Sequence, residues 1–139
     1  MPSSRVLPEA NSYLHQIRPT PLVRVSLGDE QPGGAGCNTI EPGIWCKLEF
    51  LNPSGSTKDR IARHILEKAW RQGQLSTGDT VAEASSGSTS IAFALACSQM
   101  GLHFVAFIPD TATSERELII RAYGGEVRRV GAACPKFCA

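Results

Sequence analysis

The sequence predicts an α/β domain, in which a parallel sheet carries helices on its faces. From residue 44 onward, strand-like stretches alternate with helix-like stretches, and a polar turn separates each strand from the following helix. Strands that alternate with helices of this length need crossover connections, which produce parallel strands. The 139 residues, 42% of them hydrophobic, suffice for one ordinary globular domain.

The N-terminal part, residues 1–43, is expected to be mostly loop, because prolines and glycines recur throughout it. The exception is Leu22–Val25, a short extended segment. Residues Ile44–Phe50 alternate well enough for a strand, and Asn52-Pro53-Ser54-Gly55-Ser56 then breaks it. A turn is therefore predicted before residue 57.

Residues 57–131 show the alternation most clearly. A first helix follows from the spacing of its apolar residues and ends near Gly73, a residue suited to the left-handed cap. The same reasoning predicts a strand at Thr80–Ala84, a helix over Ile91–Met100 closed by Gly101, a strand at His103–Ile108, a helix opened by a capping box at Ser114–Glu117 and ended at Gly124, and a strand at Glu126–Val130.

Charge and hydropathy exclude several classes of partner. Lys and Arg total 14 against 13 acidic residues, so no basic field favours nucleic acid or an acidic membrane. The longest apolar stretch, Phe104–Ile108, is far shorter than the roughly 20 residues that cross a bilayer. The first residues lack the apolar core of a secretory signal. We therefore expect a cytoplasmic protein with a small-molecule partner.

The cysteines predict neither disulfides nor a metal site. Their number is odd and their spacing irregular: Cys37, Cys46, Cys97, Cys134 and Cys138. Cys134 and Cys138 form a C-x-x-x-C pair, but zinc needs four ligands and no second pair or nearby histidine follows. Reduced thiols and no metal are expected.

Two loops between a strand and a helix carry residues suited to chemistry. In Ser85–Ser90, small side chains allow backbone N–H groups to point outward at the positive end of the next helix, which suits an anion such as a phosphate or a carboxylate. A serine-rich N-cap turn with no ligand is the alternative. In the other loop, Lys58 stands at a helix start, where the dipole favours the neutral amine that attacks an aldehyde. The alternative is a solvated lysine beside Asp59 and Arg60.

Both loops resemble motifs of one enzyme family. The run Asn52-Pro53-Ser54-Gly55-Ser56-Thr57-Lys58-Asp59-Arg60 resembles the cofactor-lysine motif of the cysteine synthase and cystathionine beta-synthase family, and Glu83-Ala84-Ser85-Ser86-Gly87-Ser88-Thr89 resembles its substrate-carboxylate loop. The resemblance extends from Thr20 to Val130 through Thr20-Pro21-Leu22-Val23-Arg24, Pro109, Ser114-Glu115-Arg116 and Gly124-Gly125-Glu126-Val127.

The resemblance implies the N-terminal portion of a fold-type II (tryptophan synthase beta-like) enzyme that uses pyridoxal 5'-phosphate. Lys58 would bind the cofactor covalently and later act as general base, and Ser88 would contact the cofactor. Ser85, Ser86, Gly87 and Thr89 would hold the carboxylate of an amino-acid substrate. The implied reaction is beta-replacement on O-acetylserine or serine, which makes cysteine.

Departures from the family pattern keep two other functions open. Ser88 stands where the family usually has Asn, and Ser90 where it has Gly; this version resembles branches that include cysteine desulfhydrases, so beta-elimination is an alternative. Residues 44–131 are expected to form the α/β domain and residues 132–139 a divergent tail, without the family's C-terminal cofactor-phosphate domain. A third possibility is thus a non-catalytic fragment that forms a homo-oligomer or pairs with a full-length homologue.

Overall fold

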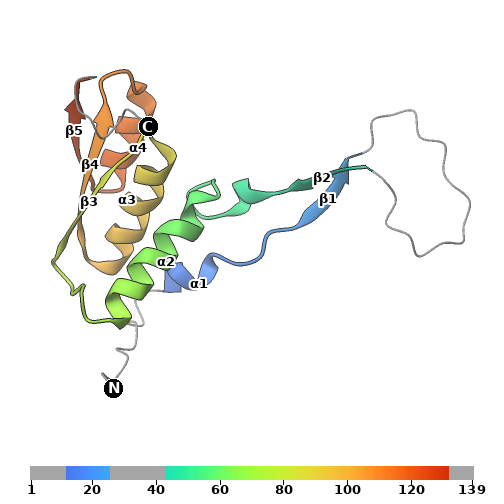
Figure 1. Ribbon diagram of the computed structural model, residues 1–139, viewed down its shortest axis with the longest axis horizontal. Coiled ribbons are helices and arrows are strands. Elements are labelled where there is room, and N and C mark those ends of the chain that lie inside the picture. The colour runs from blue at the N-terminus through green and yellow to red at the C-terminus, as the bar shows by residue number, and fades with distance from the viewer. Residues whose placement is uncertain (1–11, 26–42, 132–139) are drawn as a thin grey trace, which may run out of the picture.

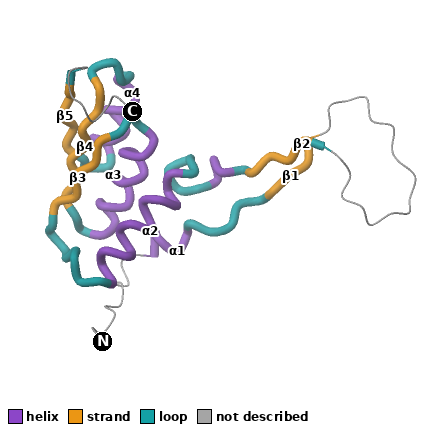
Figure 2. Tube along the Cα trace, in the orientation of Figure 1, coloured by secondary structure: helices purple, strands orange, loops and turns teal. Residues whose placement is uncertain are grey.

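The computed structural model describes residues 12–25 and 43–131, which form an α/β unit with a two-stranded hairpin extending from it (Figure 1, Figure 2). The elements in chain order are α1 Ser12–Gln16, β1 Leu22–Val25, β2 Ile44–Lys47, the 3-10 helix η2 Glu49–Leu51, α2 Lys58–Arg71, β3 Thr80–Ala84, α3 Ser88–Met100, β4 His103–Pro109, α4 Ser114–Ala122 and β5 Glu126–Val130. Residues 132–139, and with them Cys134 and Cys138, lie outside the described residues, as does Cys37.

The predicted parallel sheet is confirmed. Its strand order is β3-β4-β5, with Thr80 opposite His103 and Val105 opposite Glu126. Two successive right-handed crossovers to the next neighbouring strand place both connecting helices on the same side. Helices α3 and α4 accordingly lie on one face of the sheet (Figure 1).

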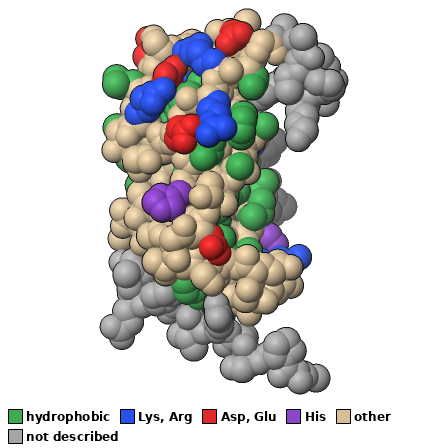
Figure 3. Space-filling view, turned by 90° about the vertical axis from the view of Figure 1, so that its left-hand side faces the viewer, with side chains coloured by type: hydrophobic (Ala, Val, Ile, Leu, Met, Phe, Trp, Pro, Cys, Tyr) green, Lys and Arg blue, Asp and Glu red, His purple; other side chains and the backbone are tan. Residues whose placement is uncertain are grey.

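The central strand β4 reports the difference between the two faces. Phe104, Ala106 and Ile108 point toward the helices and are buried, whereas Val105 and Phe107 point to the other side and are half-buried. Figure 3 looks at the molecule from the sheet side, where charged side chains gather toward one end. On this face the Arg128 guanidinium lies 5.9 Å from the centre of the Phe107 ring and pairs with Glu126.

Helix α3 is the centre of the core, because it lies between the sheet and α2. Its buried residues surround most of the helix: Ser90, Ala92, Phe93, Ala94, Ala96, Cys97 and Met100. Several are small, which allows the neighbouring elements to approach closely. The Phe93 ring stacks on Phe104 of β4 with centroids 6.1 Å apart. From the other side, α2 packs on α3 with Ala62, Leu66 and Trp70 buried.

The hairpin pairs β1 with β2 in antiparallel register, from Leu22 opposite Lys47 to Val25 opposite Ile44. The predicted strand over Ile44–Phe50 is therefore too long by three residues, since it ends at Lys47 and the chain turns into η2. The turn directs Glu49 toward Arg60 of α2, with which it forms an ion pair at 2.8 Å. This tertiary contact outweighs the local alternation.

The sequence predicted the C-terminal ends of the helices better than their N-terminal ends. Gly73 and Gly101 have φ values of +70° and +66°, the left-handed conformation expected just after a helix. The predicted capping box is wrong: Ser114 is the first helical residue, and Glu117 pairs with arginines instead. In the described part of the chain, no helix has the length and apolarity to cross a bilayer.

Candidate active site

The two predicted loops lie at the same end of the helical layer. Helix α2 packs against α3, and both helices begin on the side where the strands of the parallel sheet end (Figure 1). The loop at Ser85–Ser90 follows β3 of that sheet, whereas the loop before Lys58 follows β2 of the hairpin. Helix packing, and not a shared sheet edge, therefore brings the two loops to one side.

Lys58 is the first residue of α2, and its side chain is exposed. Its backbone N–H donates to the Ser56 hydroxyl at 3.1 Å. The next residue, Asp59, is fully buried, and its carboxylate accepts hydrogen bonds from the backbone N–H of Ser54 at 3.2 Å and from the Ser54 hydroxyl at 2.6 Å. Asp59 thus holds Ser54 and the loop before Lys58 in place, and Lys58 points away from the core.

A polar network ties this loop to the base of the hairpin. The Glu49 carboxylate accepts from both Nε and Nη2 of Arg60 at 2.8 Å, from the Thr20 hydroxyl at 2.5 Å and from Asn52 Nδ2 at 2.8 Å. The hydrogen bond from Arg60, followed by that from Thr20, lowers the pKa of Glu49 to about 2. The same Arg60–Glu49 hydrogen bond raises the pKa of Arg60.

Sequence reasoning did not assign this role to Glu49 or Thr20. Thr20, Asn52 and Arg60 stand inside the motifs quoted above, and that place was the available signal for their role. Glu49 lies in none of these motifs. Asn52 is 5% exposed, and its Oδ1 has no hydrogen-bond partner among the described residues.

In the loop before α3, some polar groups make hydrogen bonds within the protein and others do not. The Ser85 oxygen accepts from the backbone N–H of Ser90 at 3.2 Å and of Gly87 at 3.3 Å, so Ser85 satisfies donors at the start of the helix. The N-cap position itself is Gly87, so Ser85 caps the helix from two residues further back along the chain. In contrast, the hydroxyl and backbone N–H groups of Ser86, Ser88 and Thr89 make no hydrogen bond to another described residue.

Gly87 occupies a position that only glycine fits. Its φ is +153°, and a Cβ atom there would overlap with the side chain of Arg116. Arg116 extends from α4, and its Nη1 donates to the Ser86 carbonyl at 2.5 Å. A positive side chain therefore lies beside the open donors of the loop, which suits a bound anion.

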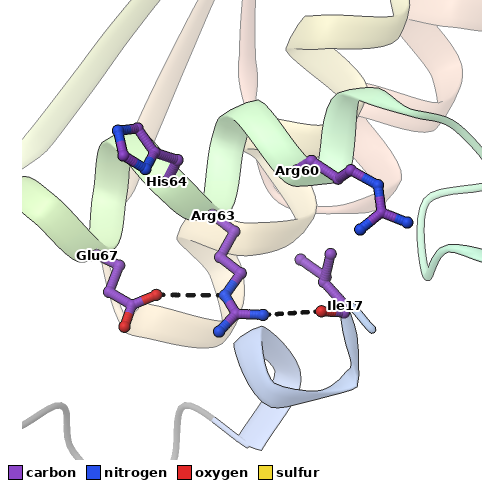
Figure 4. A pocket seen from close by; sticks show the side chains of 5 residues that line it. All are labelled: Ile17, Arg60, Arg63, His64 and Glu67. Atoms are coloured by element: carbon purple, nitrogen blue, oxygen red, sulfur yellow. Dashed lines mark hydrogen bonds and ion pairs between the residues drawn. The ribbon is translucent and has the colours of Figure 1, made fainter. Parts of the chain in front are cut away.

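The pockets along α2 do not include these residues. One of about 340 Å³ is lined by Ile17, Arg60, Arg63, His64 and Glu67 (Figure 4). Arg63 bridges the Glu67 carboxylate at 3.2 Å and the Ile17 carbonyl at 2.7 Å, so it satisfies a carbonyl just after α1. This pocket joins two helices and holds no predicted site residue.

The histidines and the other metal-ligating side chains form no further cluster in the described residues. His15, His64 and His103 are exposed and lie on separate elements. Within residues 12–25 and 43–131, no group of three or more metal-ligating side chains is found.

Comparison with known proteins defines the family. The family model described as pyridoxal-phosphate dependent enzyme matches residues 13–136. The chain therefore belongs to the pyridoxal-phosphate-dependent enzyme family, as the resemblance of its loops implied.

The similar proteins are longer than this chain. A cysteine synthase of Staphylococcus aureus is 44% identical over 84 residues, which are 60% of this chain and 27% of the relative. The O-ureido-L-serine synthase of Streptomyces lavendulae is 38% identical over 122 residues, which are 87% of this chain and 35% of the relative. The chain thus spans about a third of the length of the curated relatives it matches.

Solved structures support the fold across the same length. A crystal structure of O-ureido-L-serine synthase superposes with a TM-score of 0.76 at 33% identity, covering 91% of this chain and 37% of that chain. A hydrogen sulfide-producing enzyme from Fusobacterium nucleatum superposes with a TM-score of 0.73 at 35% identity, covering 88% of this chain and 38% of that chain.

The described residues fit the cofactor of this family. Lys58 presents an exposed primary amine, the group that binds an aldehyde. The neighbouring helix starts with a loop whose uncommitted donors and Arg116 suit a carboxylate.

Proposed function

We propose that Lys58 holds pyridoxal 5'-phosphate and that the loop from Ser85 to Thr89 holds the carboxylate of a small amino-acid substrate. The observation that carries this proposal is the placement of an exposed lysine and a loop with uncommitted donors at the same end of the packed helices α2 and α3. The reaction is beta-replacement on O-acetylserine or serine in cysteine biosynthesis, and the similarity to cysteine synthase supports it.

Each residue has a role in that reaction. The bound cofactor supplies an electron sink for the carbanion that remains when the alpha proton leaves. Lys58 would hold the cofactor and would be the base that takes the alpha proton from the substrate. Ser85, Ser86, Gly87 and Thr89 would bind the substrate carboxylate, and Ser88 would contact the cofactor.

A second candidate reaction is beta-elimination, as in a cysteine desulfhydrase. Ser88 replaces the Asn that the family usually has, and a hydrogen sulfide-producing enzyme is among the structural relatives. Serine keeps a donor at this position but has a shorter reach than asparagine.

The hairpin supports a proposal about assembly. Leu22 is 56% exposed, Ile44 51% and Trp45 46%, so this two-stranded sheet presents large apolar side chains to solvent. We propose that a second polypeptide covers it, either another copy of this chain or a full-length homologue, and that residues 44–131 act as the α/β domain.

The free thiols Cys46 and Cys97 support a cytoplasmic location. A non-catalytic fragment with these contacts is the remaining candidate.

The decisive experiment is an absorbance spectrum of the purified chain after pyridoxal phosphate is added and the excess removed. Lys58→Ala is compared with Lys68→Ala, which removes an exposed lysine from the last turn of the same helix. We expect the wild-type and Lys68→Ala chains to retain the cofactor band and Lys58→Ala to lose it. Equal retention in the Lys58→Ala chain would contradict the assignment.

Product assays then separate the reactions. Cysteine formed from O-acetylserine and sulfide supports replacement, and sulfide released from cysteine supports elimination. A retained cofactor band with neither product supports the non-catalytic candidate.

A further inference from the structure

Ser90 distinguishes the loop before α3 from the family pattern, in which this position is usually glycine. Its side chain is fully buried, although Ser90 stands in the first turn of α3. Its hydroxyl lies 2.6 Å from Glu83 Oε2 and 2.7 Å from the Ser85 hydroxyl. Ser90 therefore connects a carboxylate on β3 with the first residue of the substrate loop.

The chemistry of the three groups fixes the direction of these hydrogen bonds. An ionised carboxylate only accepts, so the Ser90 hydroxyl donates its single proton to Glu83. That proton is then not available for the second contact. The Ser85 hydroxyl must therefore be the donor to Ser90, and the series of hydrogen bonds runs from Ser85 through Ser90 to Glu83.

Ser85 consequently has no donor left for a ligand. Its hydroxyl proton goes to Ser90, and its backbone N–H donates to the Phe107 carbonyl of β4 at 3.2 Å. Its oxygen already accepts from the N–H groups of Gly87 and Ser90. The donors without a partner among the described residues belong to Ser86, Ser88 and Thr89.

We propose that Glu83 and Ser90 are positioning residues that turn the Ser85 hydroxyl inward, so that Ser85 shapes the loop and the substrate carboxylate is bound by the other loop residues. This inference rests on the proposed substrate loop and refines the role of Ser85 within it. Glycine at residue 90 would leave Ser85 free to donate outward. The Glu83–Ser90 pair therefore decides which donors of the loop are left for the substrate.

The first test needs no ligand. Hydrogen exchange of the backbone amides of residues 87 and 90 is followed by NMR in the full chain, because both amides donate to Ser85. Glu83→Leu and Ser90→Ala should each speed this exchange by about fivefold, the effect of losing one ordinary hydrogen bond. Glu83→Gln, which keeps an acceptor oxygen, should restore a rate near that of the wild type.

The control removes a different serine of the same helix. Ser98 donates to the Leu95 carbonyl on the exposed side of α3, so Ser98→Ala should leave both amides unchanged. Unchanged exchange in both Glu83→Leu and Ser90→Ala would overturn the proposal. If Ser90→Ala does not fold, the comparison of Glu83→Leu with Glu83→Gln decides the question.

The second test uses L-serine as the probe on the chain loaded with pyridoxal phosphate. Thr89→Val should weaken serine binding by about tenfold, since a hydrogen bond to a charged group is lost. Ser85→Ala and Ser90→Ala should each weaken serine binding less than Thr89→Val does. The double variant should lose no more affinity than Ser85→Ala alone, because both residues act through the same series of hydrogen bonds. Additive losses would show that Ser85 donates directly and would overturn the proposal.

The outcomes of the two tests are independent of each other. If the wild-type chain binds no L-serine, the proposed function fails for this chain, while the exchange measurement still decides the positioning role of Glu83 and Ser90.

Discussion

The α/β unit and the hairpin bury their apolar side chains to opposite extents. In the unit, Ile108 of β4 and Ile120 of α4 are 0% exposed. In the hairpin, Ile44 is 51% and Leu22 56% exposed, although both lie in regular strands. Ile108 and Ile44 both lie in strands and yet have different environments, because among the described residues only the unit has helices that cover its strands.

The connection between the two regions is polar. Lys47 Nζ donates to the Thr20 hydroxyl at 2.7 Å and to the Thr20 carbonyl, and Glu49 joins Thr20 to Arg60 of α2. Hydrogen bonds and ion pairs fix the direction of the hairpin, whereas apolar burial stabilises the unit. The hairpin therefore depends on polar contacts with the unit and contributes no residue to its core.

The largest expected effect compares two isoleucines. Ile108→Ala should destabilise the chain by about 2–5 kcal/mol, because it leaves a cavity in the core. Ile44→Ala should change the free energy of unfolding by only about 0.5 kcal/mol, since half of that side chain already contacts solvent. Urea unfolding followed by circular dichroism measures both. A cost of several kcal/mol for Ile44→Ala would mean that the isolated hairpin is already covered.

A smaller effect is expected at the connection. Asp59→Ala removes the acceptor of two hydrogen bonds from Ser54 and should cost about 1.5–3 kcal/mol, the range for hydrogen bonds to charged groups. Asp110→Ala is the matched control, because Asp110 is exposed and follows β4. The same urea titration applies, and equal stability of the two variants would show that Asp59 does not hold the loop before Lys58.

Sequence patterns predicted the unit more accurately than the connection. The strands at residues 80–84 and 126–130 were placed with the bounds that the structure shows, because alternation and turn residues are local signals. The errors at Phe50 and at the Ser114–Glu117 box share one cause. Glu49 pairs with Arg60, and Glu117 pairs with Arg129 as well as with its i+4 neighbour Arg121. No local pattern reveals the distant partners Arg60 and Arg129.

The parts of the candidate site were predicted, whereas the helix packing that brings them together was not. Lys58 and the serine-rich loop were expected at helix starts, and both are found there. That α2 packs on α3, and so brings the two starts to one side, depends on the core residues of both helices. The burial of Ser90 depends on Glu83, a side chain on the preceding strand, and a serine run alone cannot predict it.

The pH dependence of stability tests the polar connection. The pKa of Glu49 is lowered from 4.5 to about 2, so its ion pair contributes fully above pH 4.5 and is lost as the pH falls toward 2. Glu49→Gln removes the charge while keeping the size. We expect the stability difference between wild type and Glu49→Gln to be largest above pH 5 and to vanish near pH 2. A pH-independent difference would show that the charge of Glu49 does not matter.

The smallest effect concerns two thiols, one in each region. Burial raises the pKa of Cys97 in α3 to about 12, and its side chain is 0% exposed, so its reactive thiolate is scarce at neutral pH. Cys46 in β2 is half-buried. Brief alkylation of the folded chain should modify Cys46 before Cys97, as peptide mass spectrometry would show, and both should react equally in urea. Early modification of Cys97 would mean that α3 separates from α2 or the sheet more easily than its packing implies. The unit and the hairpin would then differ only in degree in how well they protect their side chains.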